Sequence, residues 1–224
     1  MRSSESETSI HKKFIQIQKK ESKSMMTTLL VKFEGKIIET TVTNKANVAD
    51  DWIQSINRLL KQHQGHKIIG MSCKFIHHPI LSMSNKTALL QLCFQTKALI
   101  LQLLHIDSIP QSIRDFFSDS NTTFVGIDIQ NNSRKLLEEY AVRVSRMVDI
   151  HFLAKKWFPV SYRGMPSLRA LAYCIVGFSV RKCRSNANKK GDWESRILDT
   201  ELVEQACVDA YTSYIIAHKL LKHG

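Results

Sequence analysis

The chain has 224 residues, of which 43% are hydrophobic, and carries 32 Lys and Arg against 20 Asp and Glu. This length and apolar content are enough for one substantial domain with a buried core. The formal charge of +12 favours a polyanionic partner such as nucleic acid. The longest apolar run, residues 170–180, is too short for a membrane-spanning helix, which needs about 20 residues. We therefore expect no membrane partner and a location in the nucleus or the cytoplasm.

Residues 1–26 differ in composition from the rest of the chain. They are rich in Ser, Lys and Glu and show almost no apolar periodicity beyond Phe14, Ile15 and Ile17. This composition predicts a flexible polar tail, followed by one domain over residues 27–224.

The first half of this domain predicts two hairpins with a helix and a strand between them. Apolar runs at residues 29–33 and 36–42 flank Glu34-Gly35, a hairpin signal, and a helix is expected from an N-cap at Asn47 or Asp50 to about His63. Residues 68–75 then alternate as a strand, and residues 87–94 and 98–104 predict the second hairpin. On the strand, Gly70, Ser72 and Lys74 share one side.

Helices and strands alternate in the second half. Ser108 is expected to cap a helix with Pro110 in its first turn, and a strand at residues 123–127 precedes helices at 133–140 and 152–158. Ser167 is expected to cap the next helix, and a last helix begins near Asp199. The alternation predicts a mixed sheet covered by helices.

A series of short stretches carries a more specific signal. In chain order they are Leu90-Gln91-Leu92-Cys93, Leu103-Leu104-His105, Ile109-Pro110-Gln111-Ser112, Phe124-Val125-Gly126, Lys135-Leu136-Leu137, Asp192-Trp193-Glu194 and Ala206-Cys207-Val208-Asp209-Ala210-Tyr211. The series resembles the DnaQ-like 3'-5' exonuclease superfamily, most closely its plant Werner-syndrome-type domains. The resemblance implies a ribonuclease H-like α/β fold, with a mixed sheet and helices on both faces, and 3'-5' exonuclease activity on DNA or RNA.

In that family, an Asp-x-Glu strand motif, a third Asp and a Tyr-x-x-x-Asp helix motif hold two Mg²⁺ or Mn²⁺ ions that drive phosphodiester hydrolysis. The resemblance places the first motif at Ser72 and Lys74, the third Asp at Asn132, and the last motif at Gln205 and Asp209. Only Asp209 is retained as a metal ligand. We therefore expect Mg²⁺ or Mn²⁺ to bind weakly and hydrolysis to be weak or absent. An alignment that uses Asp128 in place of Asn132 is the less favoured alternative.

Two roles stay open for Lys74: it could pair with Asp209 in place of a metal ion, or it could face a phosphate group directly. A basic stretch is also expected to contact the phosphate backbone, although a solvated loop explains it nearly as well. Its residues are Arg181, Lys182, Arg184, Lys189 and Lys190. The pair His77-His78 is expected to be part of a loop and not a metal site.

Three functions are compatible with these residues. The first is a weak exonuclease in which Asp209 binds a metal ion with help from Asp128, Asp149 or backbone carbonyl groups. The second is a non-catalytic nucleic-acid-binding module. Its affinity for nucleic acid would fall as the salt concentration rises and would be unchanged by EDTA. The third is a protein-interaction module that forms homo- or hetero-oligomers.

Overall fold

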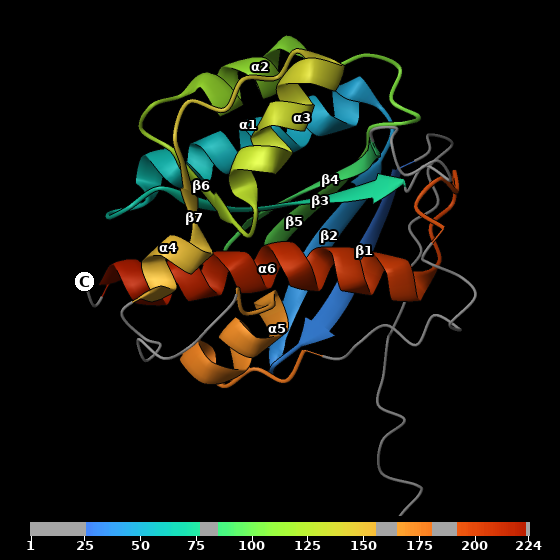
Figure 1. The fold of residues 1–224 in the computed structure, drawn as a ribbon. Helices are drawn as coiled ribbons and strands as arrows, with labels where there is room; N and C mark the ends of the chain where they lie inside the picture. The colour runs from blue at the N-terminus through green and yellow to red at the C-terminus, as the bar shows by residue number, and fades with distance from the viewer. Residues whose placement is uncertain (1–25, 77–84, 156–164, 181–191, 223–224) are drawn as a thin grey trace, which may run out of the picture.

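The computed structural model describes residues 26–76, 85–155, 165–180 and 192–222. Its centre is a seven-stranded mixed sheet with the strand order β1-β2-β5-β4-β3-β6-β7. Helices α1, α2 and α3 cover one face of the sheet, and α6, α4 and α5 lie on the other (Figure 1). The predicted α/β class, with a mixed sheet and helices on both faces, is therefore confirmed.

The two predicted hairpins and the strand between them are confirmed. β1 pairs antiparallel with β2, and β4 pairs antiparallel with both β3 and β5. Parallel pairs join β2 to β5, β3 to β6 and β6 to β7. The strands are β1 Met26–Phe33, β2 Lys36–Thr43, β3 Ile68–Ile76, β4 Lys86–Phe94, β5 Lys97–Gln102, β6 Thr123–Gly126 and β7 Met147–Asp149.

The helices are α1 Ala46–Gln62, α2 Gln111–Ser118, α3 Ile129–Tyr140, α4 Ile150–Ala154, α5 Leu168–Leu171, the π-helical turn η2 Ala172–Val176 and α6 Thr200–Lys222. The predicted cap at Ser167 is confirmed, because its side chain accepts a hydrogen bond from the backbone of Ala170. The last helix begins at Thr200, as predicted, and Asp199 accepts a hydrogen bond from the backbone of Leu202.

Four predicted helix starts were wrong, in two cases because a carboxylate from another segment accepts a hydrogen bond from the first residue of the helix. α1 begins at Ala46, whose N–H donates to Asp107, and not at Asn47 or Asp50. α3 begins four residues before the predicted start, because the N–H of Ile129 donates to Asp149. α2 follows Pro110 directly, which leaves Ser108 outside the helix. α4 also begins at residue 150 instead of 152, and the end of that predicted helix lies beyond the described residues.

Helix α6 packs closely on the sheet at Gly70 of β3. A Cβ atom at this position would lie 2.1 Å from the carbonyl oxygen of Ala210 and 2.8 Å from the backbone nitrogen of Tyr214. Only glycine allows this approach. The side chains of α6 that pack on the sheet include the buried residues Val203, Cys207, Ala210, Tyr214 and Ala217, and Leu221 is only partly buried.

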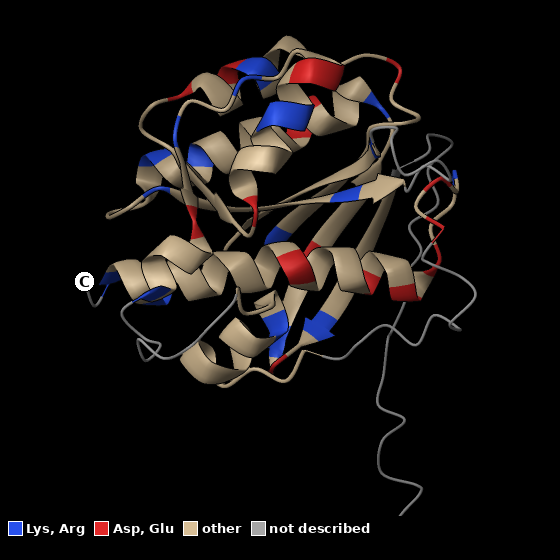
Figure 2. Cartoon of the chain, viewed as in Figure 1, with Lys and Arg blue, Asp and Glu red and all other residues tan. Residues whose placement is uncertain are grey.

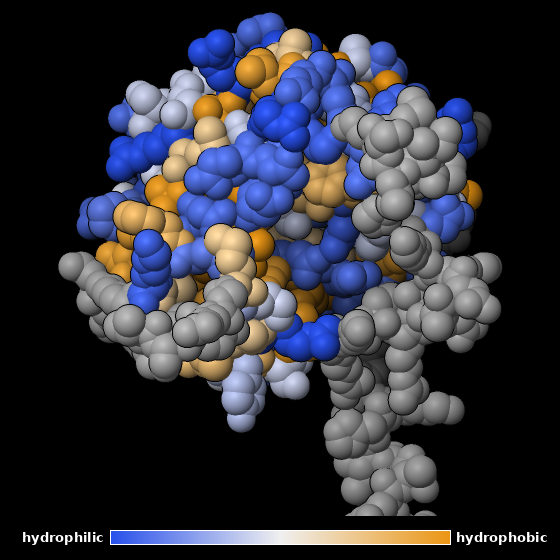
Figure 3. Space-filling model, in the orientation of Figure 1, coloured by the Kyte–Doolittle hydropathy of each residue, from blue (hydrophilic) through white to orange (hydrophobic). Residues whose placement is uncertain are grey.

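Some predicted features lie outside the described residues. They include the tail, apart from Met26 at the start of β1, the loop pair His77-His78, and the basic stretch with Arg181, Lys182, Arg184, Lys189 and Lys190. Hydrophilic residues cover much of the face in Figure 3, between smaller hydrophobic patches. Among the helices described, none has the length and apolar character needed to cross a membrane.

Candidate functional site

Lys74 and Asp209 meet between β3 and α6. Lys74 lies on the side of β3 that carries Gly70, and this side faces α6. Its ammonium group donates a hydrogen bond to Oδ2 of Asp209 and forms a salt bridge with it. The side chains are 14% and 20% exposed, respectively. Because the pair is largely withdrawn from water, its attraction is screened less than that of a surface salt bridge.

The indole ring of Trp193 covers the same ammonium group. Nζ of Lys74 lies 5.1 Å from the centre of this ring, within the range of a cation–π contact. Trp193 was not among the predicted site residues, and its only sequence signal was its place in Asp192-Trp193-Glu194, shortly before the last helix. Lys74 is thus held by a carboxylate on one element and an aromatic face on another.

Two side chains near the end of β5 hold the segment that follows Trp193. Nε2 of Gln102 donates to the carbonyl oxygens of Ser195 and Arg196, at 3.0 and 3.2 Å. Nε2 of His105 lies 2.7 Å from the carbonyl oxygen of Glu194. These contacts fix the position of Trp193 beside the ion pair.

The other positions given by the resemblance carry neutral side chains. Ser72 lies two residues before Lys74 on β3 and is partly buried. Gln205 is partly exposed on α6, one turn before Asp209. Asn132 is 5% exposed in the first turn of α3, and its Nδ2 donates to the carbonyl oxygen of Ile127 at 3.3 Å. None of these three side chains brings a negative charge to the site.

The two carboxylates considered as replacements hold local structure instead. Asp128 precedes α3 in a left-handed conformation with φ of 52°, and its Oδ2 accepts from Asn131 at 3.1 Å. Asp149 accepts from the backbone of Ile129 at 3.1 Å and contacts the ring of His151 at 2.9 Å. Both carboxylates are already engaged at the start of α3 or α4.

The residues do not fit the two-metal site of the exonuclease family. Across the described ranges, no three His, Cys, Asp or Glu side chains lie close enough together to hold a metal ion. The predicted positions offer one carboxylate, a hydroxyl and two amides, and the carboxylate is bound to Lys74. Mg²⁺ requires charged oxygen ligands, and an ammonium group 4 Å from a positive charge adds about 4 kcal/mol of repulsion at a surface-like dielectric.

Comparison with known proteins places the chain among exonucleases. Residues 75–224 match the family model described as 3'-5' exonuclease. A putative 3'-5' exonuclease of Acanthamoeba polyphaga mimivirus is 24% identical over 190 residues, covering 82% of this chain and 46% of the viral protein. A 3'-5' exonuclease of Arabidopsis thaliana is 29% identical over 147 residues, covering 62% of this chain and 47% of the plant protein. The chain thus spans less than half the length of these curated relatives.

The fold itself is shared with a solved exonuclease domain. The crystal structure of the Nibbler exonuclease domain of Aedes aegypti superposes with a TM-score of 0.61 at 14% identity, covering 81% of this chain and 86% of that domain. This likeness confirms the predicted ribonuclease H-like fold. With the family match over residues 75–224, it follows that the chain belongs to the 3'-5' exonuclease family of the DnaQ-like superfamily.

Proposed function

We propose that this chain binds the 3' end of a nucleic acid strand at the site between β3 and α6 and does not hydrolyse it by a two-metal mechanism. The observation that carries the proposal is the direct bond between Lys74 and Asp209. Membership of the exonuclease family and the formal charge of +12 support a nucleic-acid ligand. Within the family, we propose that the chain belongs with the plant Werner-syndrome-type domains.

An ammonium group can replace a metal ion as a counter-charge but not as a catalyst. In two-metal sites, the ions lower the pKa of a bound water and stabilise the leaving oxygen. Lys74 provides a single positive charge and no open coordination position, so it cannot generate the attacking hydroxide in this way. The pair with Asp209 therefore keeps the site in shape while the hydrolytic step is lost.

Nucleic-acid binding needs only positive charge and accessible donors. A phosphate group can compete with Asp209 for the ammonium group of Lys74, since both are oxygen anions. We expect the stretch with Arg181, Lys182, Arg184, Lys189 and Lys190 to add contacts to the phosphate backbone. Affinity should accordingly fall as salt rises and be unchanged by EDTA. Homo- or hetero-oligomers and a nuclear or cytoplasmic location remain predictions.

A degradation assay tests the loss of hydrolysis. Labelled single strands and recessed duplexes of DNA and RNA are incubated with Mg²⁺ or Mn²⁺ and the natural chain, Asp209→Ala, or a restored Ser72→Asp/Lys74→Glu/Asn132→Asp variant. The proposal predicts no shortening by the natural chain and metal-dependent shortening by the restored variant. Shortening by the natural chain that disappears in Asp209→Ala would overturn it.

A binding titration tests whether the chain binds nucleic acid at the Lys74 site. Fluorescence anisotropy with a labelled single strand should show binding by the natural chain in EDTA, and weaker binding by Lys74→Gln. Lys155→Gln is the matched control, because it removes the same charge from the end of α4. Equal affinity of the two variants would place the nucleic acid elsewhere on the protein.

A further inference from the structure

Residues 193–198, called the strap below, lead past the Lys74 site to the start of α6. The strap contacts the site through Trp193, because the ammonium group of Lys74 lies 5.1 Å from the centre of the indole ring. Lys74 is also bound to Asp209, and its side chain is only 14% exposed. A phosphate group that binds Lys74 must therefore reach an ammonium group that is already paired and covered.

Side chains, and not a strand ladder, hold the strap in place. In the described part of the chain, no backbone–backbone hydrogen bond joins the strap to the sheet. Gln102 donates to the carbonyl oxygens of Ser195 and Arg196, and His105 contacts that of Glu194. A carbonyl oxygen only accepts, so Nε2 of His105 carries the proton in this contact. Segments with few contacts open locally at low cost, so the strap can open while the sheet stays folded.

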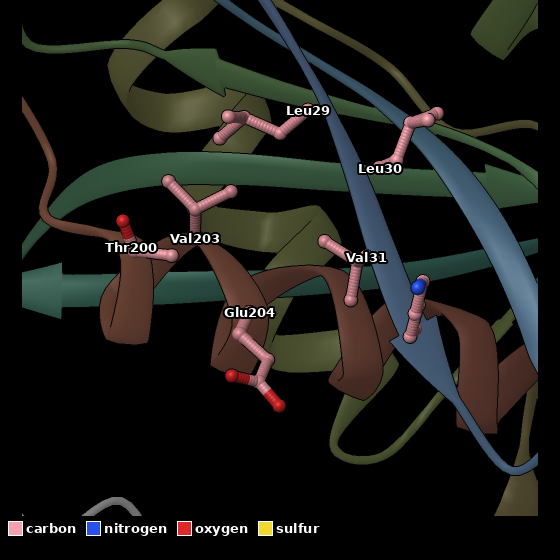
Figure 4. Close-up of a pocket in the computed structure, with 7 residues that line it drawn as sticks. Leu29, Leu30, Val31, Thr200, Val203 and Glu204 are labelled. Carbon is pink, nitrogen blue, oxygen red and sulfur yellow. The ribbon is translucent and has the colours of Figure 1, made fainter. Parts of the chain in front are cut away.

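The packing is loose where the strap joins α6. Leu198 is partly buried against the core cluster that contains Val31 of β1 and Val203 of α6. An apolar hollow lies between these two elements (Figure 4), and Leu29 and Val31 lie on the side of Val203. Thr200, the first residue of α6, also lines it. Because the lining of a hollow lacks contacts on one side, this end of the strap can move at lower cost than a closely packed segment.

The strap region is acidic, although the chain as a whole is basic. Residues 192–204 contain five acidic residues and one basic residue, Arg196. Asp192 and Glu194 flank Trp193 and are exposed. Figure 2 shows acidic positions on this segment and along the first half of α6. Since phosphate groups carry the same sign of charge, the closed strap repels nucleic acid in addition to covering Lys74.

We propose that the strap is autoinhibitory, so that nucleic acid binds Lys74 only after the strap has opened. This inference rests on the proposed function, because it takes Lys74 as a contact of the nucleic acid. Opening moves Trp193 away from the ammonium group and Glu194 away from the incoming phosphate. The apparent affinity is reduced by the fraction of chains in which the strap is open. Changes that loosen the strap should therefore strengthen binding.

Lysine acetylation followed by mass spectrometry tests the cover without any nucleic acid. Gln102→Leu removes the bonds to Ser195 and Arg196 but keeps a side chain of similar size, and Gln111→Leu is the matched control at an exposed position of α2. A limiting reagent should label Lys74 about fivefold faster in Gln102→Leu than in the natural chain or the control.

The exposed Lys61 of α1 serves as the internal reference in the same digest. Trp193→Ala removes the cover itself and should give the same increase, which keeps the test valid if Gln102→Leu disturbs β5. Circular dichroism checks that each variant is folded. Equal labelling of Lys74 in all chains would overturn the strap. That result would leave the proposed function standing, because the Lys74→Gln titration tests it separately.

Fluorescence anisotropy with the labelled single strand in EDTA tests the inhibition. Gln102→Leu and Trp193→Ala should bind about fivefold more tightly than the natural chain, and Gln111→Leu should bind equally. Adding Lys74→Gln to Gln102→Leu should abolish this gain. Weaker binding by Trp193→Ala would make the ring a contact of the nucleic acid and overturn the proposal. Faster labelling of Lys74 without tighter binding would overturn the inhibition as well.

Discussion

The ammonium group of Lys74 on β3 bonds to the carboxylate of Asp209 on α6, across 135 residues of sequence. In the alignment that we propose with the exonuclease family, Lys74 takes the position of an acidic metal ligand. In this structure, the side chain of Lys74 links β3 directly to α6. The indole of Trp193 covers the same cation at 5.1 Å.

We expect the Lys74–Asp209 pair to contribute to stability. Both side chains are mostly buried, so removing one leaves the other charge without its partner. In a cycle of Lys74→Met, Asp209→Asn and the double variant, urea unfolding should give a coupling energy of about 1 to 2 kcal/mol. Costs that add to within about 0.3 kcal/mol would show that the pair contributes nothing.

Gly70→Ala should destabilise the domain by about 3 kcal/mol, because its new Cβ meets backbone atoms that cannot rotate away. The carbonyl oxygen of Ala210 would lie 2.1 Å from this atom. Ser72→Ala, on the same side of the strand, serves as the control and should cost far less. Thermal unfolding compares the two variants, and equal melting temperatures would contradict the close packing of α6.

Asp107 should act as a remote N-cap for α1. Its Oδ1 accepts from the backbone N–H of Ala46 at 3.0 Å, and this bond is the main cause that lowers its pKa from 3.8. Asp107→Ala should therefore cost about 1 kcal/mol near neutral pH. Because the folded pKa is lowered, the contribution is present above pH 3.8 and is lost as the pH falls through the folded value. Urea unfolding near neutral pH and below the folded pKa of Asp107 measures the difference in unfolding free energy between the natural chain and Asp107→Ala. This difference should be smaller in acid.

His218 should make stability sensitive to mild acid. Burial lowers its pKa from 6.5, with smaller effects of Lys222 and His63. Because the folded state holds the proton less tightly, stability is present above pH 6.5 and is lost as the pH falls through the folded value. The drop in unfolding free energy from about pH 7.5 to about pH 5 should be smaller in His218→Gln. If His218→Gln loses as much unfolding free energy as the natural chain, other groups cause the loss. NMR titration of the His218 ring measures its pKa directly.

The sequence predicted the sheet well, because its signals are local. Apolar runs around Glu34-Gly35 marked the first hairpin, and the alternation around Ser72 marked the strand that carries the site. Helix starts were less predictable, since the bonds from Ala46 to Asp107 and from Ile129 to Asp149 join residues distant in sequence. A capping rule that reads only neighbouring residues cannot detect such bonds.

The same limit applies to the site. Resemblance supplied the positions of Lys74 and Asp209, and their pairing was one of two predicted roles for Lys74. The structure supports this role by a direct bond. Trp193 was missed because its contact with Lys74 depends on how Gln102 and His105 hold the segment before α6. No spacing in the sequence indicates that arrangement.

The most direct test of the account is a titration with Mn²⁺ followed by electron paramagnetic resonance, which detects metal binding without any nucleic-acid substrate. The natural chain is compared with the Ser72→Asp/Lys74→Glu/Asn132→Asp variant and with Asp209→Ala. We predict no site-specific binding by the natural chain and binding by the restored variant. Binding of Mn²⁺ by the natural chain that is lost in Asp209→Ala would contradict the replacement of the metal by Lys74.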